Sequence, residues 1–543
     1  MIPRQGNARD SEIVKSHLRE TFLLDALLLV SGLIYLTAGL PFIMLFPKLQ
    51  ALIEQKPVLH RVFVLFWALL SLSVFAIQIR HKTISISQLI LNKISPAFLF
   101  TAAASIWTLS SWIRYEAFEA GFDLAIFVQA VWNTVHGNFL YSSIKGGICL
   151  LGDHFSPLLA LLALPYAAWP DPKCLLLIQS LAAASCVFPI ARLAQDRLQN
   201  SKLGVLFAAA FVFYLPVINA VRFEFHPELL AMPILLWAFH ALITGRQWRA
   251  SFLLFFSLLA KENVALVTFA YGVYAFTALP KAKRFGIFWV VFSGLYFFAA
   301  TSYVIPFFSG EEYFYLRGNY TAWLRQGSGA FARHLLRLDS WGYLFKIFAP
   351  LGFLSFLGGT SFLLTVPMLL QNLTARNEVA LSIFFQYTAL LTPFVFISAI
   401  EGARRWTARH SRRLAFYMMA ASLLMAGPSE FYIMSRNWAR GPQNRGAMDV
   451  FFSKIPPQLS VRAQEFLAPH LAGRRELHIY ENQHPREGGS PKAHSTDLVI
   501  LRPENLTYSS ADVFQLEQTG YERAASIPGV WIFVKKGESK IVI

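Results

Sequence analysis

Long apolar runs recur along most of this chain, and they constrain its fold more than any other feature. An apolar run of about 20 residues is long enough to cross a bilayer as a helix. The first run, residues 23–46, exceeds that length, and no small-residue cleavage site follows it, so we expect a membrane helix there rather than a removed signal peptide. The apolar segments are 23–46, 62–79, 97–113, 174–191, 203–221, 228–244, 251–260, 264–277, 286–307, 343–357, 360–372, 378–400 and 412–427.

Composition supports a membrane protein and argues against a nucleic-acid partner. Of 543 residues, 55% are hydrophobic and 15% are charged, whereas soluble domains carry about 25% charged residues. The formal net charge of +17 would indicate nucleic-acid binding in a soluble protein. Here the basic residues gather in short segments between apolar runs, as in cytoplasmic loops. The 3 cysteines form no C-x-x-C pair, so we expect neither a disulfide framework nor a thiolate metal site.

The distribution of Lys and Arg predicts the orientation in the membrane. The basic segments are 80–93, 192–202, 245–250, 281–284 and 401–413. Placing all of them in the cytoplasm requires that the Pro-interrupted segment 155–169 lies on or dips into the membrane surface without crossing it. The N-terminus is then inside, the C-terminus is outside, and about thirteen helices cross or re-enter the cell (inner or plasma) membrane.

This orientation divides the chain into three regions. Residues 1–95 are expected to hold an N-terminal cytoplasmic segment and two transmembrane helices, and residues 96–427 a membrane core with a long first outer loop at 114–173. Residues 428–543 are more polar, with short apolar strands, which favours a small soluble α/β domain on the extracytoplasmic side. Its expected strands are 476–480, 498–501 and 530–534, and its expected helices are 461–470 and 510–520.

Asp123 is the first candidate for chemistry. It begins a stretch in which apolar residues at helical spacing form one face, and Gly137 stands where that helix should end. One interpretation is a helix cap on an interfacial amphipathic helix. The other is a carboxylate at the lip of a membrane cavity, serving as a general base or a metal ligand.

Two further clusters lie in expected outer segments. Asp153 and His154 precede the Pro-broken apolar stretch, where they can bind a phosphate or a divalent ion such as Mg²⁺ or Mn²⁺, or form a helix cap beside a solvated histidine. The link between two apolar segments contains Arg222, Glu224 and His226. That is more charge than a turn needs, although its two phenylalanines can also anchor the link at the membrane interface.

Charges inside apolar sequence form the third group. Lys261 and Glu262 interrupt an apolar run, and such charges are expensive in a membrane, so they mark functional sites by default. We expect Lys261 near an anionic phosphate; the alternative is an ion pair at a hairpin tip.

The loop 308–342 interleaves aromatic and charged residues, including Arg317. This mixture suits sugar stacking and phosphate binding, and it also suits an ordinary amphipathic surface loop. Gln386 and Tyr387, at the start of a later apolar segment, are weaker candidates for substrate binding.

The sequence resembles a family of uncharacterised membrane proteins, domain of unknown function 2079. The resemblance rests on FDLAIFVQAVWNTVHGN, LGDHFSPLLALLALPY, FEFHPE and LLAKEN, in this order over roughly residues 95–400, and on IPPQLSVRAQEFLAPHL in the tail. This resemblance names no reaction.

A more distant resemblance is to membrane glycosyltransferases of the GT-C class, which use polyprenyl-phosphate sugars. These enzymes carry an acidic residue at the start of an amphipathic helix in the first outer loop, and Asp123 has the similar position in this chain. The resemblance implies a GT-C-like helical fold. It also implies Asp123 as the base that deprotonates an acceptor, and Lys261, with Arg222 or Arg317, as binders of the lipid phosphate.

The chain departs from that class at two places. The common Asp-Glu pair is here Asp123-Leu124, and no lysine follows Asp153 where the class has a Glu-Lys-Pro-Pro type segment. These departures weaken the implied metal and phosphate assignments.

The function favoured by these features is transfer of a sugar from a polyprenyl-phosphate donor in the membrane to a glycan, lipid or protein acceptor at the outer face. A transporter or flippase for a lipid-linked or small anionic solute is the alternative, but transporters tend to show repeated halves, and none is evident here. A third reading is a membrane scaffold that displays the tail.

Overall fold

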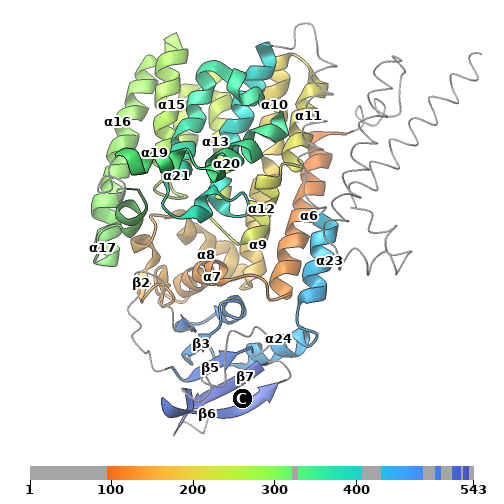
Figure 1. The fold of residues 1–543 in the computed structure, drawn as a ribbon, viewed down its shortest axis with the longest axis vertical. Helices are drawn as coiled ribbons and strands as arrows, with labels where there is room; N and C mark the ends of the chain where they lie inside the picture. Colours follow the sequence, from red (N-terminus) through yellow and green to blue (C-terminus); the bar gives the residue numbers. More distant parts are fainter. Residues whose placement is uncertain are drawn as a thin grey trace, which may run out of the picture.

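The computed structural model describes residues 94–320, 328–405, 430–480, 496–502, 516–527 and 530–536. The segments predicted at 23–46, 62–79 and 412–427 lie outside these residues. The described chain forms a bundle of helices with a β-sheet at one end, and α7 and α8 lie between the bundle and the sheet (Figure 1).

Four helical segments are long and apolar enough to cross a membrane. They are α6 (Pro96–Glu116), α9 with α10 (Pro172–Leu198), residues Pro280–Ser309, and Leu354–Thr374. The helices α11 (Ser201–Val212) and α12 (Leu215–Phe223) pass the same test as a pair bent by 46°. By length and composition, the described residues therefore contain four candidate spans, or five with the bent pair, and the count of thirteen stays a prediction.

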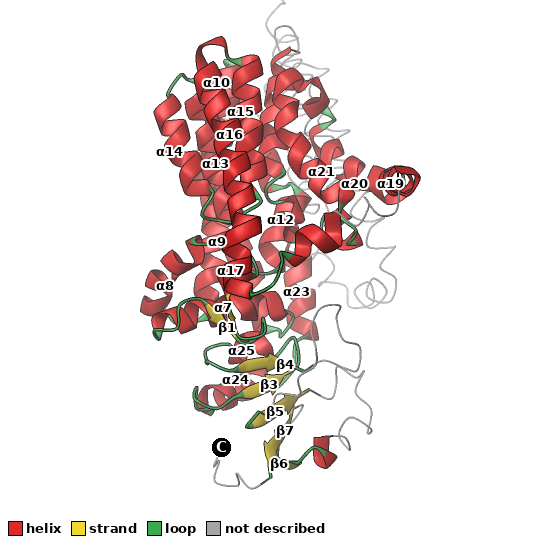
Figure 2. Cartoon of the chain, turned by 90° about the vertical axis from the view of Figure 1, so that its left-hand side faces the viewer, coloured by secondary structure: helices red, strands yellow, loops and turns green. Residues whose placement is uncertain are grey.

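Shorter helices make up the rest of the described helical structure, some in the bundle and some beside the sheet (Figure 2). The span Pro280–Ser309 consists of η2 (Pro280–Ala282), α16 (Lys283–Ala299), the π-helical turn η3 (Ala300–Val304) and α17 (Ile305–Ser309). The others are α7 (Phe122–Val135), η1 (Leu150–Gly152), α8 (Leu158–Ala168), α13 (Glu228–Ile243), α14 (Gln247–Ser257), α15 (Val264–Ala278), η4 (Leu316–Tyr320), α19 (Ser328–Leu335), α20 (Leu338–Phe348), η5 (Ala349–Leu351), η6 (Leu354–Thr365), α21 (Val366–Thr374), η7 (Glu378–Leu381), η8 (Gln386–Thr388), helical residues 392–405, α23 (Glu430–Arg440), α24 (Arg445–Lys454) and α25 (Ala468–Leu471).

Small residues let α15 and α16 approach closely. A Cβ atom added to Gly272 would lie 2.6 Å from the backbone nitrogen of Val290, and one added to Gly286 would lie 2.7 Å from that of Phe276. Membrane helices associate through such close packing because lipid supplies no hydrophobic drive between them. Neither glycine can carry a side chain without moving the two helices apart.

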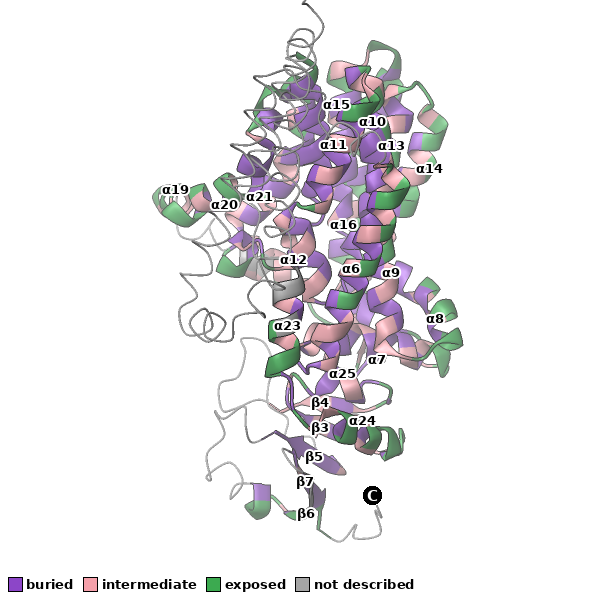
Figure 3. Cartoon of the chain, turned by 90° about the vertical axis from the view of Figure 1, so that its right-hand side faces the viewer, coloured by how far each residue is buried: buried purple, intermediate pink, exposed green. Residues whose placement is uncertain are grey.

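The outer surfaces of α14 and α16 are apolar. Trp248, Phe252, Leu295 and Phe298 are each more than half exposed, and Figure 3 shows exposed residues along these helices. A soluble protein rarely exposes such a contiguous apolar surface. Since a bilayer is the solvent that such a surface requires, it agrees with the membrane composition of the sequence.

The tail residues form a mixed five-stranded sheet in the order β4-β3-β5-β7-β6. Its strands are β3 (Val461–Ala463), β4 (Leu477–Ile479), β5 (Leu498–Leu501), β6 (Tyr521–Ile527) and β7 (Val530–Lys535). Strand β3 pairs in parallel with both β4 and β5, whereas β7 is antiparallel to β5 and β6.

The sheet differs from its prediction at two places. Residues 461–470 were expected to form a helix, but they begin as β3 and become helical only at α25. The β-branched Val461 and the buried Ala463 fill a central strand position between β4 and β5, which outweighs the local helical pattern. Strand β6 was not predicted, and the expected helix 510–520 lies mostly outside the described residues.

The sheet shares its hydrophobic core with the bundle. Val461 and Leu477 belong to the same cluster of buried residues as Leu124 and Val128 of α7. Only the far side of the sheet has a separate small cluster, formed by Val499, Leu501, Leu516, Tyr521 and Phe533. The domain boundary at 428 stays a prediction, but the tail is packed against the membrane core rather than tethered to it.

Candidate active site

Asp123 lies in the first turn of α7, but it does not cap this helix. The N-cap position is Gly121, which has no side chain to accept the first N–H groups. Glu224 takes that role from another part of the chain: its Oε1 accepts from the Gly121 nitrogen at 2.7 Å and its Oε2 from the Leu124 nitrogen at 2.8 Å. The interpretation of Asp123 as a helix cap is therefore wrong. As expected, α7 ends just before Gly137, whose φ is +87°.

The link between α12 and α13 is held in a defined shape by Gln179 of α9. Its Oε1 accepts from the backbone nitrogen of His226 at 2.6 Å, and its Nε2 donates to the carbonyls of Val221 and Glu224. Arg114 of α6 also donates to the carbonyls of Arg222 and Phe223. The sequence analysis missed Gln179, which is fully buried. An amide side chain within an apolar helix was the signal in the sequence, because such a group requires hydrogen-bond partners.

His226 faces Asp123. The His226 Nε2 lies 3.5 Å from Asp123 Oδ2, and the His226 side chain is only 4% exposed. Burial by itself would raise the pKa of Asp123, but the hydrogen bond and charge of His226, together with Lys145 and Lys261, lower it below its usual value. Burial would likewise lower the pKa of His226, but Asp123 and Glu228 raise it above its usual value. The two groups therefore favour an imidazolium–carboxylate pair.

Lys261 lies in the turn between α14 and α15, where its ammonium group pairs with Glu228 Oε1 at 2.6 Å. The carboxylate of Glu262 points to another set of partners. It accepts from the Phe155 nitrogen at 2.9 Å, meets His154 Nδ1 at 2.9 Å and accepts from the Tyr313 hydroxyl at 2.5 Å. The turn thus contacts α13, the loop between α7 and α8, and the segment after α17.

The loop between α7 and α8 contributes a lysine that the sequence analysis missed. Lys145 stands on the hairpin between β1 (Tyr141–Ser142) and β2 (Ile148–Cys149), and its Nζ lies 2.8 Å from Asp153 Oδ1. The only local signal was the following Gly146 and Gly147, both with positive φ, which allow the tight turn. The ring of Tyr315 stacks on His154 with centroids 4.6 Å apart.

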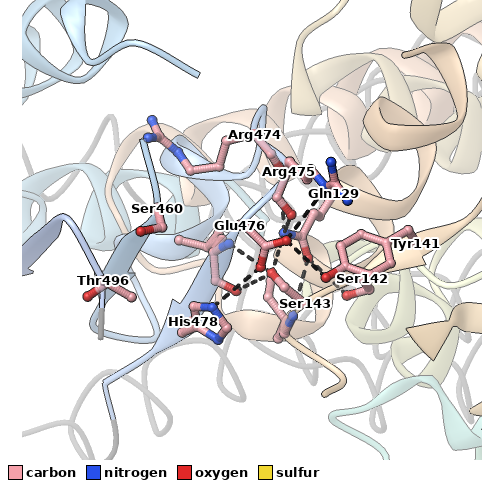
Figure 4. Close-up of polar contacts among 12 residues, drawn as sticks. Gln129, Tyr141, Ser142, Ser143, Ser460, Arg474, Arg475, Glu476, His478 and Thr496 are labelled. Atoms are coloured by element: carbon pink, nitrogen blue, oxygen red, sulfur yellow. Dashed lines mark hydrogen bonds and ion pairs between the residues drawn. The ribbon is translucent and has the colours of Figure 1, made fainter. Parts of the chain in front are cut away.

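The hairpin is fastened to the sheet of the tail (Figure 4). Ser143 Oγ donates to the Leu477 carbonyl at 2.7 Å and accepts from the Leu477 nitrogen at 2.8 Å. Gln129 of α7 donates to Ser143 Oγ at 2.8 Å and to the Arg475 carbonyl at 2.9 Å. The helix that carries Asp123 and the hairpin that carries Lys145 are therefore held by the same part of the tail.

The remaining candidates are distributed around this cluster. Arg222 donates to Asn219 Oδ1 within its own helix at 2.6 Å. Tyr387 lies within electrostatic range of Asp123 and Lys261, next to Gln386 in η8. Arg317 lies in η4, and its side chain is outside the part of the chain that the structure describes.

Three buried oxygen acceptors, on candidate residues or on residues that contact or adjoin them, have no hydrogen-bond partner. They are Glu228 Oε2, Asn263 Oδ1 and Gln386 Oε1. Buried polar atoms are nearly always hydrogen-bonded in native proteins, so each of these atoms calls for an explanation. One explanation is a ligand that supplies several hydrogen-bond donors to these oxygen atoms.

The described residues do not fit a metal site. Among them, no group of three or more His, Cys, Asp or Glu side chains could hold an ion. Asp153 and His154, the predicted ligands, are instead engaged by Lys145 and Glu262, respectively. Asp153 is thus paired with a cationic side chain, and His154 has a hydrogen-bond partner in Glu262.

The arrangement of helices resembles that of a solved membrane protein, ArnT. The structure of ArnT from Cupriavidus metallidurans bound to undecaprenyl phosphate matches with a TM-score of 0.50 at 12% identity, covering 80% of this chain and 97% of that chain. The apo structure of the same protein matches with a TM-score of 0.51 at 9% identity and the same coverage. ArnT is a GT-C glycosyltransferase. At these identities the likeness shows the fold alone.

The family is shown by sequence. Residues 114–537 match the model of DUF2079, described as a predicted membrane protein, and the chain belongs to this family. The match reaches through the tail sheet, beyond both the 95–400 region and the tail motif at residues 455–471 that carry the resemblance. No curated protein matches the chain.

Proposed function

We propose that this protein is a membrane glycosyltransferase that transfers a sugar from a polyprenyl-phosphate donor to an acceptor at the outer face of the membrane. One observation carries the proposal: a carboxylate at the start of α7 is paired with His226, and the charges of two lysines, Lys145 and Lys261, help to lower its pKa. A base beside cationic groups is what the reaction requires, since the donor brings its own activated leaving group.

In the proposed step, Asp123 accepts the proton of an acceptor hydroxyl or amine. The acceptor atom forms a bond to the anomeric carbon of the sugar, and the bond from that carbon to the phosphate oxygen breaks. The electron pair of the broken bond stays on the polyprenyl phosphate. Lys145 and Lys261 stabilise this developing charge, since an ammonium group has three N–H donors and each carboxylate partner occupies only part of them.

The unpartnered acceptors support a sugar as the transferred group. Glu228 Oε2, Asn263 Oδ1 and Gln386 Oε1 all need donors, and sugar hydroxyls are dense in donors. Because the likeness to ArnT is structural, the undecaprenyl phosphate of that complex supports a lipid-phosphate donor only by analogy.

The test compares a deletion strain with strains complemented by wild type, Asp123→Asn and Asp171→Asn. Asp171 caps α9 through its Oδ1, and asparagine caps equally well, so this variant is a matched control. Mass spectrometry measures envelope glycans and polyprenyl-phosphate sugars. We expect the deletion to accumulate a lipid-linked sugar and lose one glycan modification, with rescue by wild type and Asp171→Asn only.

Rescue by Asp123→Asn at an equal protein level would show that Asp123 is not the base. An unchanged glycan and lipid profile in the deletion strain would contradict transferase activity altogether.

A further inference from the structure

The helices α19 and α20 form an amphipathic pair that projects from the side of the bundle (Figure 3). The apolar side chains between and along them are strongly exposed: Leu336 is 66% exposed, Leu338 88%, Trp341 58% and Phe345 50%. Short helices with exposed Leu, Trp and Phe beside basic residues are typical of the membrane interface. This pair lies outside the candidate active site.

Arg337 stands at the junction of the two helices, at the N-cap of α20. Its Nη1 donates to Glu378 Oε1 at 3.1 Å. Its Nε and Nη2 are buried, and neither has a hydrogen-bond partner. These two nitrogens form the edge of the guanidinium group that binds phosphate or carboxylate with two parallel hydrogen bonds. Glu378 cannot supply the missing bonds, because its one contact uses the other end of the group and its side chain is 80% exposed.

Ser340 provides a second, independent sign of a ligand at the same place. Its side chain is 1% exposed, and its Oγ also lacks a hydrogen-bond partner. The backbone nitrogen of Ser340 donates to the Arg337 carbonyl at 3.1 Å, so the two residues occupy the N-cap and N3 positions of one helix, three residues apart on the same face. The N-terminus of α20 adds backbone N–H groups that favour an anion.

We propose that Arg337, Ser340 and the N-terminus of α20 bind the phosphate of an anionic phospholipid. The ligand must be an acceptor, because the unpartnered atoms of Arg337 are donors and the serine hydroxyl can donate as well. A tetrahedral phosphate diester offers two charged oxygens to the Nε–Nη2 edge. The exposed Leu338, Trp341 and Phe345 place an apolar surface beside this anion site, which matches the acyl chains attached to a lipid phosphate and not a soluble anion. This site does not rest on the proposed transferase function.

The experiment measures lipid binding to the purified full-length protein by native mass spectrometry after delipidation in detergent. The probes are phosphatidylglycerol, diacylglycerol with the same acyl chains, and inorganic phosphate. The variants are Arg337→Gln, Ser340→Ala and the control Arg333→Gln, which removes the same charge from the exposed side of α19. Size-exclusion profiles and thermal midpoints establish that each variant is folded.

We expect wild type to bind a first phosphatidylglycerol about tenfold tighter than diacylglycerol, since bidentate bonds to a charged group are strong. Arg337→Gln should remove this preference and Ser340→Ala should reduce it about threefold, whereas Arg333→Gln should keep it. Equal binding by Arg337→Gln and Arg333→Gln would overturn the site. If Arg337→Gln does not fold, an unchanged preference in Ser340→Ala overturns it instead. Displacement of phosphatidylglycerol by millimolar inorganic phosphate would overturn the lipid as the ligand.

Discussion

The pairing of Asp123 with His226 explains how a carboxylate whose side chain is only 28% exposed remains ionised. Burial disfavours the charged form, and only a nearby positive charge and hydrogen bond compensate for it. His226 supplies both at 3.5 Å, and its own backbone is held by Gln179. The proposed base is therefore kept in its ionised form by a residue 103 positions away in the sequence.

This pair should make stability depend on pH. The raised pKa of His226 contributes stability that is present below its unfolded pKa of about 6.5 and is lost as the pH rises through the folded pKa. The lowered pKa of Asp123 contributes stability that is present above about pH 3.9 and is lost as the pH falls through its folded pKa. We expect wild type to exceed His226→Gln in thermal midpoint most strongly between about pH 4 and 6.5, with the difference shrinking at higher pH.

The measurement is the thermal midpoint in detergent from pH 5 to 9 for wild type, His226→Gln and His136→Gln. His136 follows the last residue of α7, is exposed and stacks on Trp132, so it controls for the loss of an imidazole. A difference between wild type and His226→Gln that is constant with pH would contradict the ion pair.

At the scale of elements, α7 is held at its N-terminus and in its middle by other parts of the chain. Glu224 caps its N-terminus, and Gln129 in its middle bonds to the hairpin and to the tail backbone. The Tyr115 and Phe118 rings before α7 stack on either side of His470 in α25. Contacts with the tail thus help to fix the position of the helix that carries Asp123.

Replacing Gln129 by Leu should loosen this connection. In the variant, the Arg475 carbonyl and the Ser142 and Ser143 hydroxyls lose their hydrogen bonds to the Gln129 amide. Leaving a buried polar group without a partner costs about 1–3 kcal/mol of folding free energy. We expect faster hydrogen exchange in residues 474–479 and in β1 and β2, measured by mass spectrometry on the purified protein. Ser453→Ala, on the exposed side of α24, is the control, and equal exchange in the two variants would show that Gln129 does not hold the tail.

At the scale of the whole molecule, the active-site cluster, α7 and the sheet lie toward one end of the bundle (Figure 1). The basic segments 245–250 and 281–284 join helices away from that cluster, as the positive-inside rule requires if the cluster is outside. The tail would then be an outer cover beside the site rather than a cytoplasmic appendage.

This orientation predicts the labelling of single cysteines. In a background in which Cys149, Cys174 and Cys186 are replaced by serine, Glu517→Cys in the tail should react with a membrane-impermeant maleimide in intact cells. Gly245→Cys, in the turn between α13 and α14, should react only after the membrane is permeabilised. The reverse pattern would place the tail and the site inside.

The sequence by itself determined the class of molecule. Apolar length and sparse charge are local properties, so they predicted α6 and the α9–α10 span without any tertiary contact. The family was indicated by a resemblance of short sequence motifs, which are also local. The residue types in Asp123, His226 and Lys261 also stood out, because charges beside apolar segments are costly wherever the chain folds.

Only the tertiary structure decided which charges meet. Glu224, and not Asp123, caps α7. Lys145 pairs with Asp153 from a hairpin that the sequence did not predict. Lys261 pairs with Glu228. The sequence also assigned residues 461–470 to a helix, since local propensity cannot show that two parallel strands will flank Val461. The physical reason is the same in each case: electrostatic and strand pairing depends on distances between residues far apart in the chain, which a local pattern does not contain.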